Sequence, residues 1–374
     1  MVPRSWHTDR TLGEVIRTRR RETTINTLLT DIKDRFDPML ERELEQAVAQ
    51  IDGSAPLLGR MVRFHLGWVE PDGAPTDRTV RQTIQGKRIR PYLTLLTTEA
   101  LGGTPDNAIP IAAAIELLHN FTLIHDDIQD RSPNRRHRAT VWRVWGDAQA
   151  INAGDALFAA AQRTLLRTPL AAVAAPTLLH VSDAFNAMTT EIVRGQTADL
   201  EFEHASSVTA DDYLAMIRGK TAAILRFSAW AGAVAAGQSE AVAASLGELG
   251  EALGIGFQIR DDILGVWGAN DETGKDQGDD IRRKKKSLPI LLLTEQATPD
   301  DTDRLAALYK AEVIDEAGVE EVRAMLDRHD IESQAMAMMS AYHQKASAAL
   351  ETSVPTERRD ALASLLHMLD TRVS

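Results

Sequence analysis

The sequence predicts an all-α protein, from its periodicity, its composition and its lack of strand patterns. Apolar residues recur at intervals of three and four through long segments, as on one face of an amphipathic helix. Ala, Leu, Glu, Arg and Gln, which favour helices, fill these segments. No run of alternating β-branched residues is joined by Asn-Gly or Asp-Gly, the pattern typical of a β-hairpin. Helices are therefore expected throughout, and no hairpin.

The expected helices follow one another along the chain and are separated by turn-forming segments. Their ranges are 10–22, 24–51, 56–66, 77–85, 89–101, 107–130, 147–166, 176–203, 209–236, 239–267, 287–296, 301–312, 316–346 and 356–371. Gly, Pro and capping residues mark the loops GGTPDN (102–107), GANDETG (268–274), TPDDTD (298–303) and VEPDGAP (69–75). With neither a flexible linker nor a fixed-period repeat, we expect an N-terminal helical extension, 1–75, packed on one large domain, 76–374.

Composition narrows the class of protein. The chain has 374 residues, 44% of them hydrophobic, which is enough to bury a large core. Its net charge of −12 argues against nucleic acid as a partner, because phosphate backbones select basic surfaces. Cysteine is absent from the sequence, so neither disulfides nor thiolate chemistry are expected.

Membrane and export signals are also not expected. The charged start, MVPRSWHTDRTLGEVIRTRRRE, lacks the apolar region of a signal peptide. The most hydrophobic tract, residues 221–237, contains Arg226 and is rich in Ala, which favours a buried helix over a membrane span. We expect a cytoplasmic protein without a membrane span.

The segment DDIQDRSPNRRHR (126–138) places three acids at the end of an apolar helix. Asp126 and Asp130, four residues apart, project from one helical face, with Asp127 beside them. Like charges this close repel unless a cation lies between them. Oxygen ligands of this kind suit Mg²⁺, which keeps several waters and shares substrate phosphates.

A second acidic cluster follows another apolar helix, in FQIRDDILGVWG (257–268). Gln258, Asp261, Asp262 and Gly265 lie on one face. Glycine occupies the position four residues after Asp261, so the cluster has two carboxylates instead of three, which weakens it as a metal site.

Alternatives exist for these acids. A lone Asp-Asp pair at a helix end is usually a solvated terminus, but two such clusters, each after a long buried helix, favour metal binding. The HDD sequence at 125–127 also fits the His-Asp metal phosphohydrolases, in which His119, His125 and Asp126 would hold a transition metal. That alternative leaves the second cluster unexplained.

Basic residues accompany both clusters. QGKRIRP (85–91) places Lys87, Arg88 and Arg90 at a helix start, where cations oppose the helix dipole and need an anion nearby. Arg135 and Arg136 follow the first cluster and can fold back over it. Lys220 and Thr221 stand within an expected helix, and GKDQGDDIRRKKKSLP (274–289) follows the second cluster with five consecutive cations. Standing alone, each could be an ordinary solvated charge.

Together these motifs closely resemble the trans-type isoprenyl diphosphate synthases, also called polyprenyl synthetases. The resemblance rests on GKRIRP, ELLHNFTLIHDDIQD, RR, AINAGDALFA, GKT, FQIRDD and GKDQGDDIRRKKKSLP, in this order across about residues 80–290. It implies an isoprenoid synthase-type helical bundle around a deep central cavity with two facing aspartate-rich walls. It also implies a homodimer, with 76–374 as the catalytic domain.

The resemblance implies a role for each matching residue. Asp126 and Asp130 would bind two Mg²⁺ ions, supported by Asp127, and Asp261 a third, with Asp262 nearby. The other contacts to the allylic diphosphate would be Arg135, Lys220, Thr221, Gln258, Lys275 and Lys285. Isopentenyl diphosphate would contact Lys87, Arg90, His119 and Arg136.

The implied mechanism is ionisation, condensation and elimination, with Asp126, Asp127, Asp130, Lys220 and Asp261 at its centre. Metal ions and cationic side chains stabilise the leaving diphosphate, and the allylic cation is attacked by isopentenyl diphosphate. The released diphosphate takes the proton, so no protein nucleophile is required.

Four positions depart from the family pattern. Gln85 stands where a second glycine is common, and His137 and Ala139 alter the turn after the arginine pair. Gly265 replaces the last aspartate of the second motif, from which we expect weaker Mg²⁺ affinity.

Residues before the first acidic cluster bear on product length. Phe121 lies five positions before Asp126, about 7.5 Å down a helix, and Thr122 lies at the fourth position. An aromatic at the fifth position but not the fourth resembles short-chain synthases that make geranylgeranyl diphosphate, with farnesyl diphosphate synthases as close relatives. A residue in ordinary core packing is the alternative for Phe121.

Two rivals share the fold. A class I terpene cyclase would need a second Asn/Asp-Asp-x-x-Ser/Thr-x-x-x-Glu motif, and the nearest match, Asp183 to Glu191, has Ala187 in place of the hydroxyl. A non-catalytic partner subunit of a prenyl synthase should have lost aspartates or arginines, and both sets are present.

Overall fold

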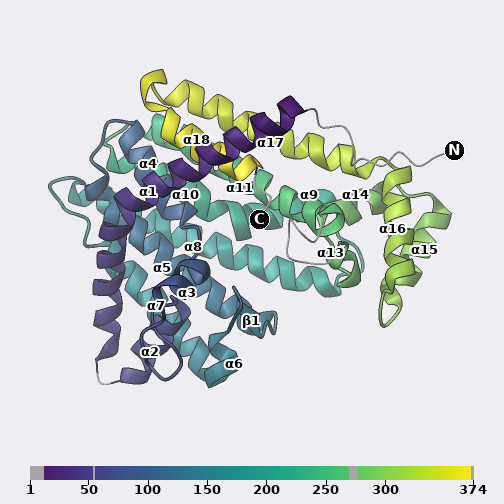
Figure 1. Ribbon diagram of the computed structural model, residues 1–374, viewed down its shortest axis with the longest axis horizontal. Coiled ribbons are helices and arrows are strands. Elements are labelled where there is room, and N and C mark those ends of the chain that lie inside the picture. Colours follow the sequence, from purple (N-terminus) through teal and green to yellow (C-terminus); the bar gives the residue numbers. More distant parts are fainter. Residues whose placement is uncertain (1–11, 54, 269–276, 372–374) are drawn as a thin grey trace.

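The computed structural model describes residues 12–53, 55–268 and 277–371. Helices dominate this part of the chain, which confirms the all-α prediction. The helices form one bundle, with α15 and α16 at one end of the molecule (Figure 1).

The elements follow the chain in three groups. The first comprises α1 (Leu12–Asp52), α2 (Pro56–His65), α3 (Arg78–Ile84), α4 (Ile89–Ala100), η1 (Pro105–Ala108) and α5 (Ile109–Gln129). The second comprises β1 (Asn134–Arg135), β2 (Arg138–Ala139), α6 (Val141–Trp145), α7 (Asp147–Leu165), α8 (Ala175–His204), α9 (Ala210–Ile217), η2 (Arg218–Ala222), α10 (Ala223–Ala235) and α11 (Glu240–Trp267). The third comprises α13 (Asp279–Arg282), α14 (Leu288–Gln296), α15 (Pro299–Lys310), α16 (Glu316–Arg328), α17 (Ile331–Ser353), η3 (Thr356–Arg358) and α18 (Asp360–Thr371).

Most expected helices are present, but three boundaries were wrong. The expected helices 10–22 and 24–51 are one continuous helix, α1. The expected helix 316–346 is two helices, because Asp330 adopts a positive φ of 52° between α16 and α17. The expected helix 209–236 is interrupted by η2, a single π-helical turn.

The prediction of no β-hairpin was also wrong. β1 and β2 pair antiparallel, with Asn134 opposite Ala139 and Arg135 opposite Arg138. Arg136 and His137 form the turn with φ values of 50° and 63°. This backbone suits a two-residue hairpin turn, which usually carries Asn-Gly or Gly-Gly, so the sequence Arg-His concealed it.

The core is built around α5. Residues Ile111 to Leu118 of this helix are all buried, which explains why its apolar character extends around the whole helix. α5 packs mainly against α7, and α11 packs against α10 and α17. Apolar side chains of α1, such as Phe36 and Leu40, belong to the same buried cluster. This cluster fixes the end of α5, and a second buried cluster, which includes Ile259 and Ile263, fixes the end of α11, so both acidic motifs are held in place.

One segment of the described chain, Pro105–Gln129, is long and apolar enough to cross a membrane, but 72% of it is buried inside the structure. It contains α5, so its hydrophobicity is explained by its place in the core.

Candidate active site

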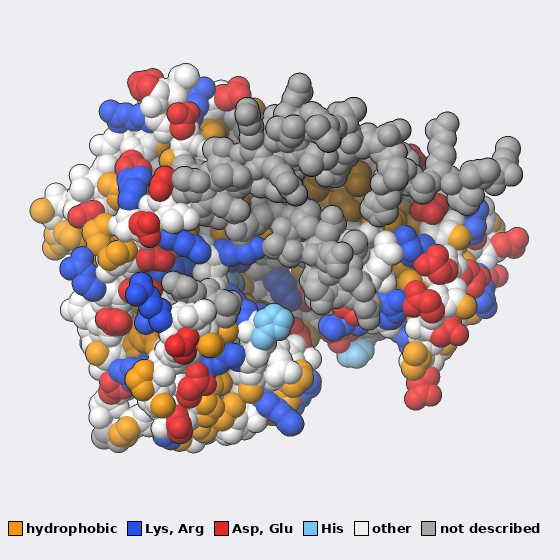
Figure 2. All heavy atoms as spheres, viewed as in Figure 1, with side chains coloured by type: hydrophobic (Ala, Val, Ile, Leu, Met, Phe, Trp, Pro, Cys, Tyr) orange, Lys and Arg blue, Asp and Glu red, His pale blue; other side chains and the backbone are white. Residues whose placement is uncertain are grey.

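The first acidic cluster lies where α5 ends, beside a cavity. Asp126 lines a cavity of about 120 Å³ together with Arg90, His119, Lys220 and Thr221. Asp130 caps the C-terminus of α5 one turn later, and its backbone N–H donates to the Asp126 carbonyl across 2.8 Å. The structure thus brings Asp126 of the acidic cluster to one cavity with members of two basic motifs, Arg90 of GKRIRP and Lys220 of GKT. Figure 2 shows a hollow in this face of the molecule, with Lys and Arg side chains inside it.

The acids of this cluster are under electrostatic strain. Burial raises the pKa of Asp126 to about 6, which Lys220 opposes and Asp130 reinforces. Burial also raises the pKa of Asp130, with Lys220 lowering it and Asp199 raising it. Both shifts mean that the ionised carboxylates are short of positive charge. A bound cation would supply it.

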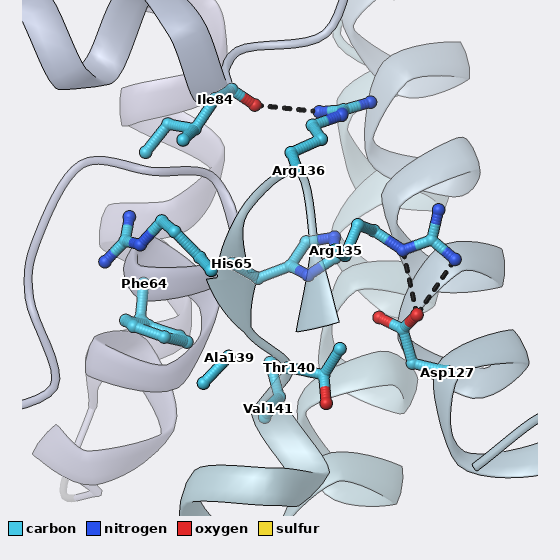
Figure 3. Close-up of a pocket in the computed structure, with 10 residues that line it drawn as sticks. Phe64, His65, Ile84, Asp127, Arg135, Arg136, Ala139, Thr140 and Val141 are labelled. Carbon is cyan, nitrogen blue, oxygen red and sulfur yellow. Dashed lines mark hydrogen bonds and ion pairs between the residues drawn. The ribbon is translucent and has the colours of Figure 1, made fainter. Parts of the chain in front are cut away.

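Asp127 points to a different partner. Its Oδ1 accepts from Arg135 Nε at 2.9 Å and lies 2.8 Å from an Nη of the same guanidinium, and its side chain is only 2% exposed. Figure 3 shows this double contact between the hairpin and α5. Asp127 thereby fixes Arg135 beside the acidic cluster.

Arg136 leaves the hairpin in another direction. It donates to the Ile84 carbonyl across 3.2 Å, at the end of α3 (Figure 3). Its guanidinium lies against Gly86, where a Cβ would be 2.6 Å from one of its nitrogens. Glycine at position 86 therefore lets Arg136 reach the GKRIRP segment.

The cationic side of the cavity is short of anions. Arg90 donates to His119 Nε2 across 3.1 Å, which leaves the proton of a neutral imidazole on Nδ1. Burial, Arg90 and Arg136 lower the pKa of His119 well below its usual value. Burial lowers the pKa of Arg90 to about 10. Within the described residues, the buried Nε of Arg90 has no hydrogen-bond partner. An anionic ligand would match this group, and the exposed Lys87 lies three residues before Arg90 in the sequence.

His65 is a member of this region that sequence reasoning missed. It lies at the end of α2 and lines a pocket with Arg135, Arg136 and Arg138 of the hairpin (Figure 3). Burial, followed by Arg135 and Arg136, lowers its pKa to about 3, so it stays neutral. A single histidine after Phe64 carries no sequence signal, because only the fold brings α2 to the hairpin.

Arg88 and Gln85 connect this region to α1. Arg88 donates to Asp37 at 2.8 Å and to Glu41 at 3.2 Å. Gln85 donates to the same Glu41 oxygen across 2.9 Å. Arg88 holds a φ of 50° immediately before α4, a strained conformation that these contacts to α1 stabilise. Arg88 therefore anchors the start of α4 to α1. Gln85, which departs from the family pattern, contributes to the same connection through Glu41.

Lys220 and Thr221 lie in η2, and π-helical turns often occur at functional sites. Lys220 donates to Asp199 of α8 across 2.5 Å. Thr221 donates to Gln258 of α11 across 3.2 Å. A Cβ on Gly195 of α8 would lie 2.3 Å from the backbone nitrogen of Lys220, so glycine at this position allows η2 to approach α8. Asp199 was missed because an isolated acid on a helix has no pattern that marks it.

Asp262 of the second cluster is completely enclosed. Its side chain is 0% exposed, and four groups donate to it: Tyr213 Oη, Gln258 Nε2 at 3.3 Å, Lys285 Nζ at 3.2 Å and the Leu288 N–H at 3.1 Å. Asp261, in contrast, is exposed. The two adjacent aspartates therefore face different surroundings, as do Asp126 and Asp127.

The two clusters are linked through their neighbours. Asp199 forms an ion pair with Lys220, and its negative charge also raises the pKa of Asp130 and of Lys285. Thr221 and Gln258 form a hydrogen-bonded path from the cavity to Asp262. Lys275 lies outside the described residues. Lys285 is described, and its pKa is raised by Asp262 and Asp280 against the effect of burial.

A divalent cation fits these residues. Among the described residues, no three Asp, Glu or His side chains converge closely enough to hold an ion by themselves. Mg²⁺ is usually bound by one or two carboxylates and completed by water and substrate phosphates. The oxygen-only donors Asp126, Asp130 and Asp261 suit this mode, and burial raises the pKa of the first two.

His125 points away from this cavity. Its ring contacts Phe121, with centroids 4.8 Å apart, and its Nε2 lies 3.3 Å from the Ile151 carbonyl on α7. A Cβ on Gly154 would lie 2.2 Å from that nitrogen. His125 therefore does not join His119 and Asp126, which contradicts the phosphohydrolase alternative. Phe121 also packs on Phe158 at 5.4 Å, and the neighbouring Thr122 lines the cavity.

Comparisons with known proteins agree with this geometry. The polyprenyl synthetase family model matches residues 76–326. The chain is 42% identical over 247 residues to a (2E,6E)-farnesyl diphosphate synthase of Mycobacterium tuberculosis H37Rv, covering 66% of this chain and 65% of that protein. It is 40% identical over 256 residues to a geranylgeranyl diphosphate synthase of the same organism, covering 68% and 70%. A polyprenyl synthetase structure from Streptomyces coelicolor A3(2) superposes with a TM-score of 0.80 at 33% identity, covering 92% and 99%.

Proposed function

Because the chain belongs to the polyprenyl synthetase family, we propose that it is a short-chain trans-prenyltransferase. It would condense isopentenyl diphosphate head to tail with an allylic diphosphate. One observation carries the proposal: Asp126, whose pKa burial raises, and Arg90, whose buried Nε has no hydrogen-bond partner among the described residues, line the same cavity. A diphosphate accompanied by divalent metal supplies both deficits at once.

The allylic diphosphate would lie between the two acidic clusters. Asp126 and Asp130 would hold Mg²⁺ on one side and Asp261 on the other, about three ions in all as the family resemblance implies. These ions would offset the charge of the leaving diphosphate. Asp127 would act through Arg135, and Asp262 through Lys285, since each is paired with that cation. Lys220, Thr221, Gln258 and Lys275 complete the proposed contacts.

Isopentenyl diphosphate would bind to the cationic side of the cavity. Lys87, Arg90 and Arg136 would carry its charge, and His119, held neutral by the cations around it, would donate from Nδ1. Neutral histidines at positions 65 and 119 keep this region from becoming still more positive before substrate arrives.

The protein's part in the reaction is electrostatic. Lys220, Arg135 and Lys285 stabilise negative charge as the allylic C–O bond breaks. The double bond of isopentenyl diphosphate then attacks the allylic carbon. A proton leaves the new intermediate for the departed diphosphate, and no side chain forms a covalent bond.

We assign residues 76–374 to the catalytic domain and residues 1–75 to a helical extension that supports it. The support comes from α1, because Asp37 and Glu41 hold Arg88 beside the proposed isopentenyl diphosphate site. A cytoplasmic location accords with a sequence that has no cysteine.

We also propose a homodimer. Large apolar side chains are exposed on α7, α8 and the segment between them: Ile151, Leu166, Leu170, Leu179 and Val193. Exposed apolar side chains gathered on consecutive elements are typical of an association surface. Leu179→Glu should lower the mass measured by light scattering. Val313→Glu, at an exposed site between α15 and α16, should leave the mass unchanged.

The activity is tested by incubating pure protein with isopentenyl diphosphate, Mg²⁺ and allylic diphosphates of increasing length. Extended linear diphosphates, with the twenty-carbon product dominant, are expected. A cyclic hydrocarbon would support the terpene cyclase instead, and no turnover the non-catalytic subunit.

A further inference from the structure

Gly265 lies on α11 four residues after Asp261, on the same helical face. A Cβ built on this glycine would lie 2.3 Å from Asp280 Oδ2 and 2.5 Å from Asp280 Cγ. These distances are far below any real contact, so the Asp280 carboxylate occupies the space that a side chain at position 265 would need. Asp280 comes from α13, fifteen positions further along the chain.

Asp280 is held firmly in this place. It is buried, with only 8% of its surface exposed. Lys285 Nζ lies 3.6 Å from Asp280 Oδ2 and 3.2 Å from Asp262 Oδ1, so one ammonium group is shared by both carboxylates. The backbone N–H of Lys285 also donates to the Asp280 carbonyl across 2.9 Å. Asp280 is thus part of the second acidic cluster in space, although not in sequence.

We infer that Asp280 takes the place of the carboxylate that α11 lacks at position 265, and that Asp280 and Asp262 together hold Lys285 next to Asp261. This inference rests on the proposed diphosphate and metal binding at the cluster. It reverses the expectation of weaker Mg²⁺ affinity drawn from Gly265 alone. Glycine at position 265 is then a requirement, because any side chain there would displace Asp280.

The charge of the cluster supports a role beyond anchoring α13. Asp262 and Asp280 share the ammonium group of Lys285 at the distances given, so both carboxylates set the position of this cation. Asp280 would act as a positioning residue, which sets the place of Lys285.

A reciprocal exchange tests this inference. Calorimetry would measure Mg²⁺-dependent binding of inorganic pyrophosphate, and thermal unfolding without metal would monitor the fold. Asp280→Asn should weaken this binding about tenfold, while Asp279→Asn, on the same short helix, should change it little. Gly265→Asp should lower the melting temperature, because two side chains compete for one space. Combining Gly265→Asp with Asp280→Gly should restore both binding and stability.

The outcomes separate this inference from the proposed function. Unchanged pyrophosphate binding in Asp280→Asn, or a double variant no better than Gly265→Asp, would overturn the inference even if prenyl transfer is confirmed. If the wild type binds Mg²⁺ and pyrophosphate and the exchange restores binding, the inference holds even where no elongated product is formed. In the double variant the side chain at position 265 no longer overlaps with one at position 280. Its pyrophosphate binding therefore tests the inference even if Asp280→Asn fails to fold.

Discussion

Lys285 Nζ donates to Asp262 Oδ1 across 3.2 Å and so joins the five-cation segment to α11. Asp262 accepts from three further groups, among them the backbone N–H of Leu288 at the start of α14. One carboxylate therefore orders the chain between α11 and α14. A run of cations that could have been a solvated loop is instead fixed beside the second acidic cluster.

Asp262→Asn is expected to destabilise the fold. An amide has a single acceptor oxygen, so its NH₂ group would face donors, leaving buried donors unsatisfied at a cost of about 2–4 kcal/mol. Urea unfolding would measure this loss. Asp183→Asn, at an exposed position of α8, is the control and should change the free energy of unfolding little. Equal stability of the two variants would show that the Asp262 contacts contribute nothing.

Asp126→Asn should stabilise the metal-free protein near pH 7.5. Because the folded pKa of Asp126 is raised to about 6 from its usual 3.8, its contribution to stability is present below pH 4 and is lost as the pH rises through 6. The neutral amide avoids that loss, and after allowance for solvent screening the gain should be about 1 kcal/mol.

Chemical denaturation at pH 4 and pH 7.5 would check the direction. The two proteins should differ at pH 7.5 and converge at pH 4, where the carboxyl group is protonated. The same substitution should remove most prenyl transfer. A variant less stable than the wild type at pH 7.5 would contradict the view that the cluster is short of positive charge.

His137→Gly should stabilise the hairpin that carries Arg135 and Arg136. His137 has a φ of 63°, which costs a side-chain-bearing residue about 1 kcal/mol and glycine almost nothing. The gain in unfolding free energy should be a fraction of that cost. Asn134→Gly in β1 should instead lose stability, since its φ is not positive. A loss in both variants would mean that the His137 side chain contributes contacts worth more than its strain.

Gly195→Ala should disturb η2 and with it Lys220. The added Cβ would lie 2.3 Å from the backbone nitrogen of Lys220, so α8 and η2 must separate. We expect a loss of stability together with at least tenfold weaker Mg²⁺-dependent pyrophosphate binding, in line with a displaced supporting contact.

Gly247→Ala is the matched control on α11. Its Cβ would meet Arg226 Cγ at 3.5 Å, an ordinary contact, so the change should stabilise the helix by up to about 1 kcal/mol. Calorimetric binding and thermal unfolding of both variants decide the prediction. Unaltered binding in Gly195→Ala would show that the close crossing is not needed to place Lys220.

Phe121→Ala should give longer products. The ring lies one turn and a half below Asp126 and packs on Phe158 at 5.4 Å, so its removal opens space below the cavity. Product chain length measured by mass spectrometry, with Thr122→Ser as the control, would check this. Products of unchanged length would assign Phe121 to core packing.

The sequence determined the local features of this protein. Helical periodicity located α4, α5, α7, α8 and α11 within a few residues. The spacing of Asp126 and Asp130 placed both on one turn at the end of α5, because residues four apart share a helical face. These features depend only on residues that are close in the sequence, so the spacing of residue types is enough to predict them.

Only the tertiary structure decided what each of these residues contacts. It separated Asp127 and Asp262, which pair with Arg135 and Lys285, from the adjacent Asp126 and Asp261. It placed His65 in one pocket with the arginines of the hairpin, Asp199 on Lys220, and Asp280 in the space left by Gly265. Such contacts join residues far apart in the chain and depend on how closely two helices approach. Periodicity carries no information about that distance, which the packing of the whole core sets.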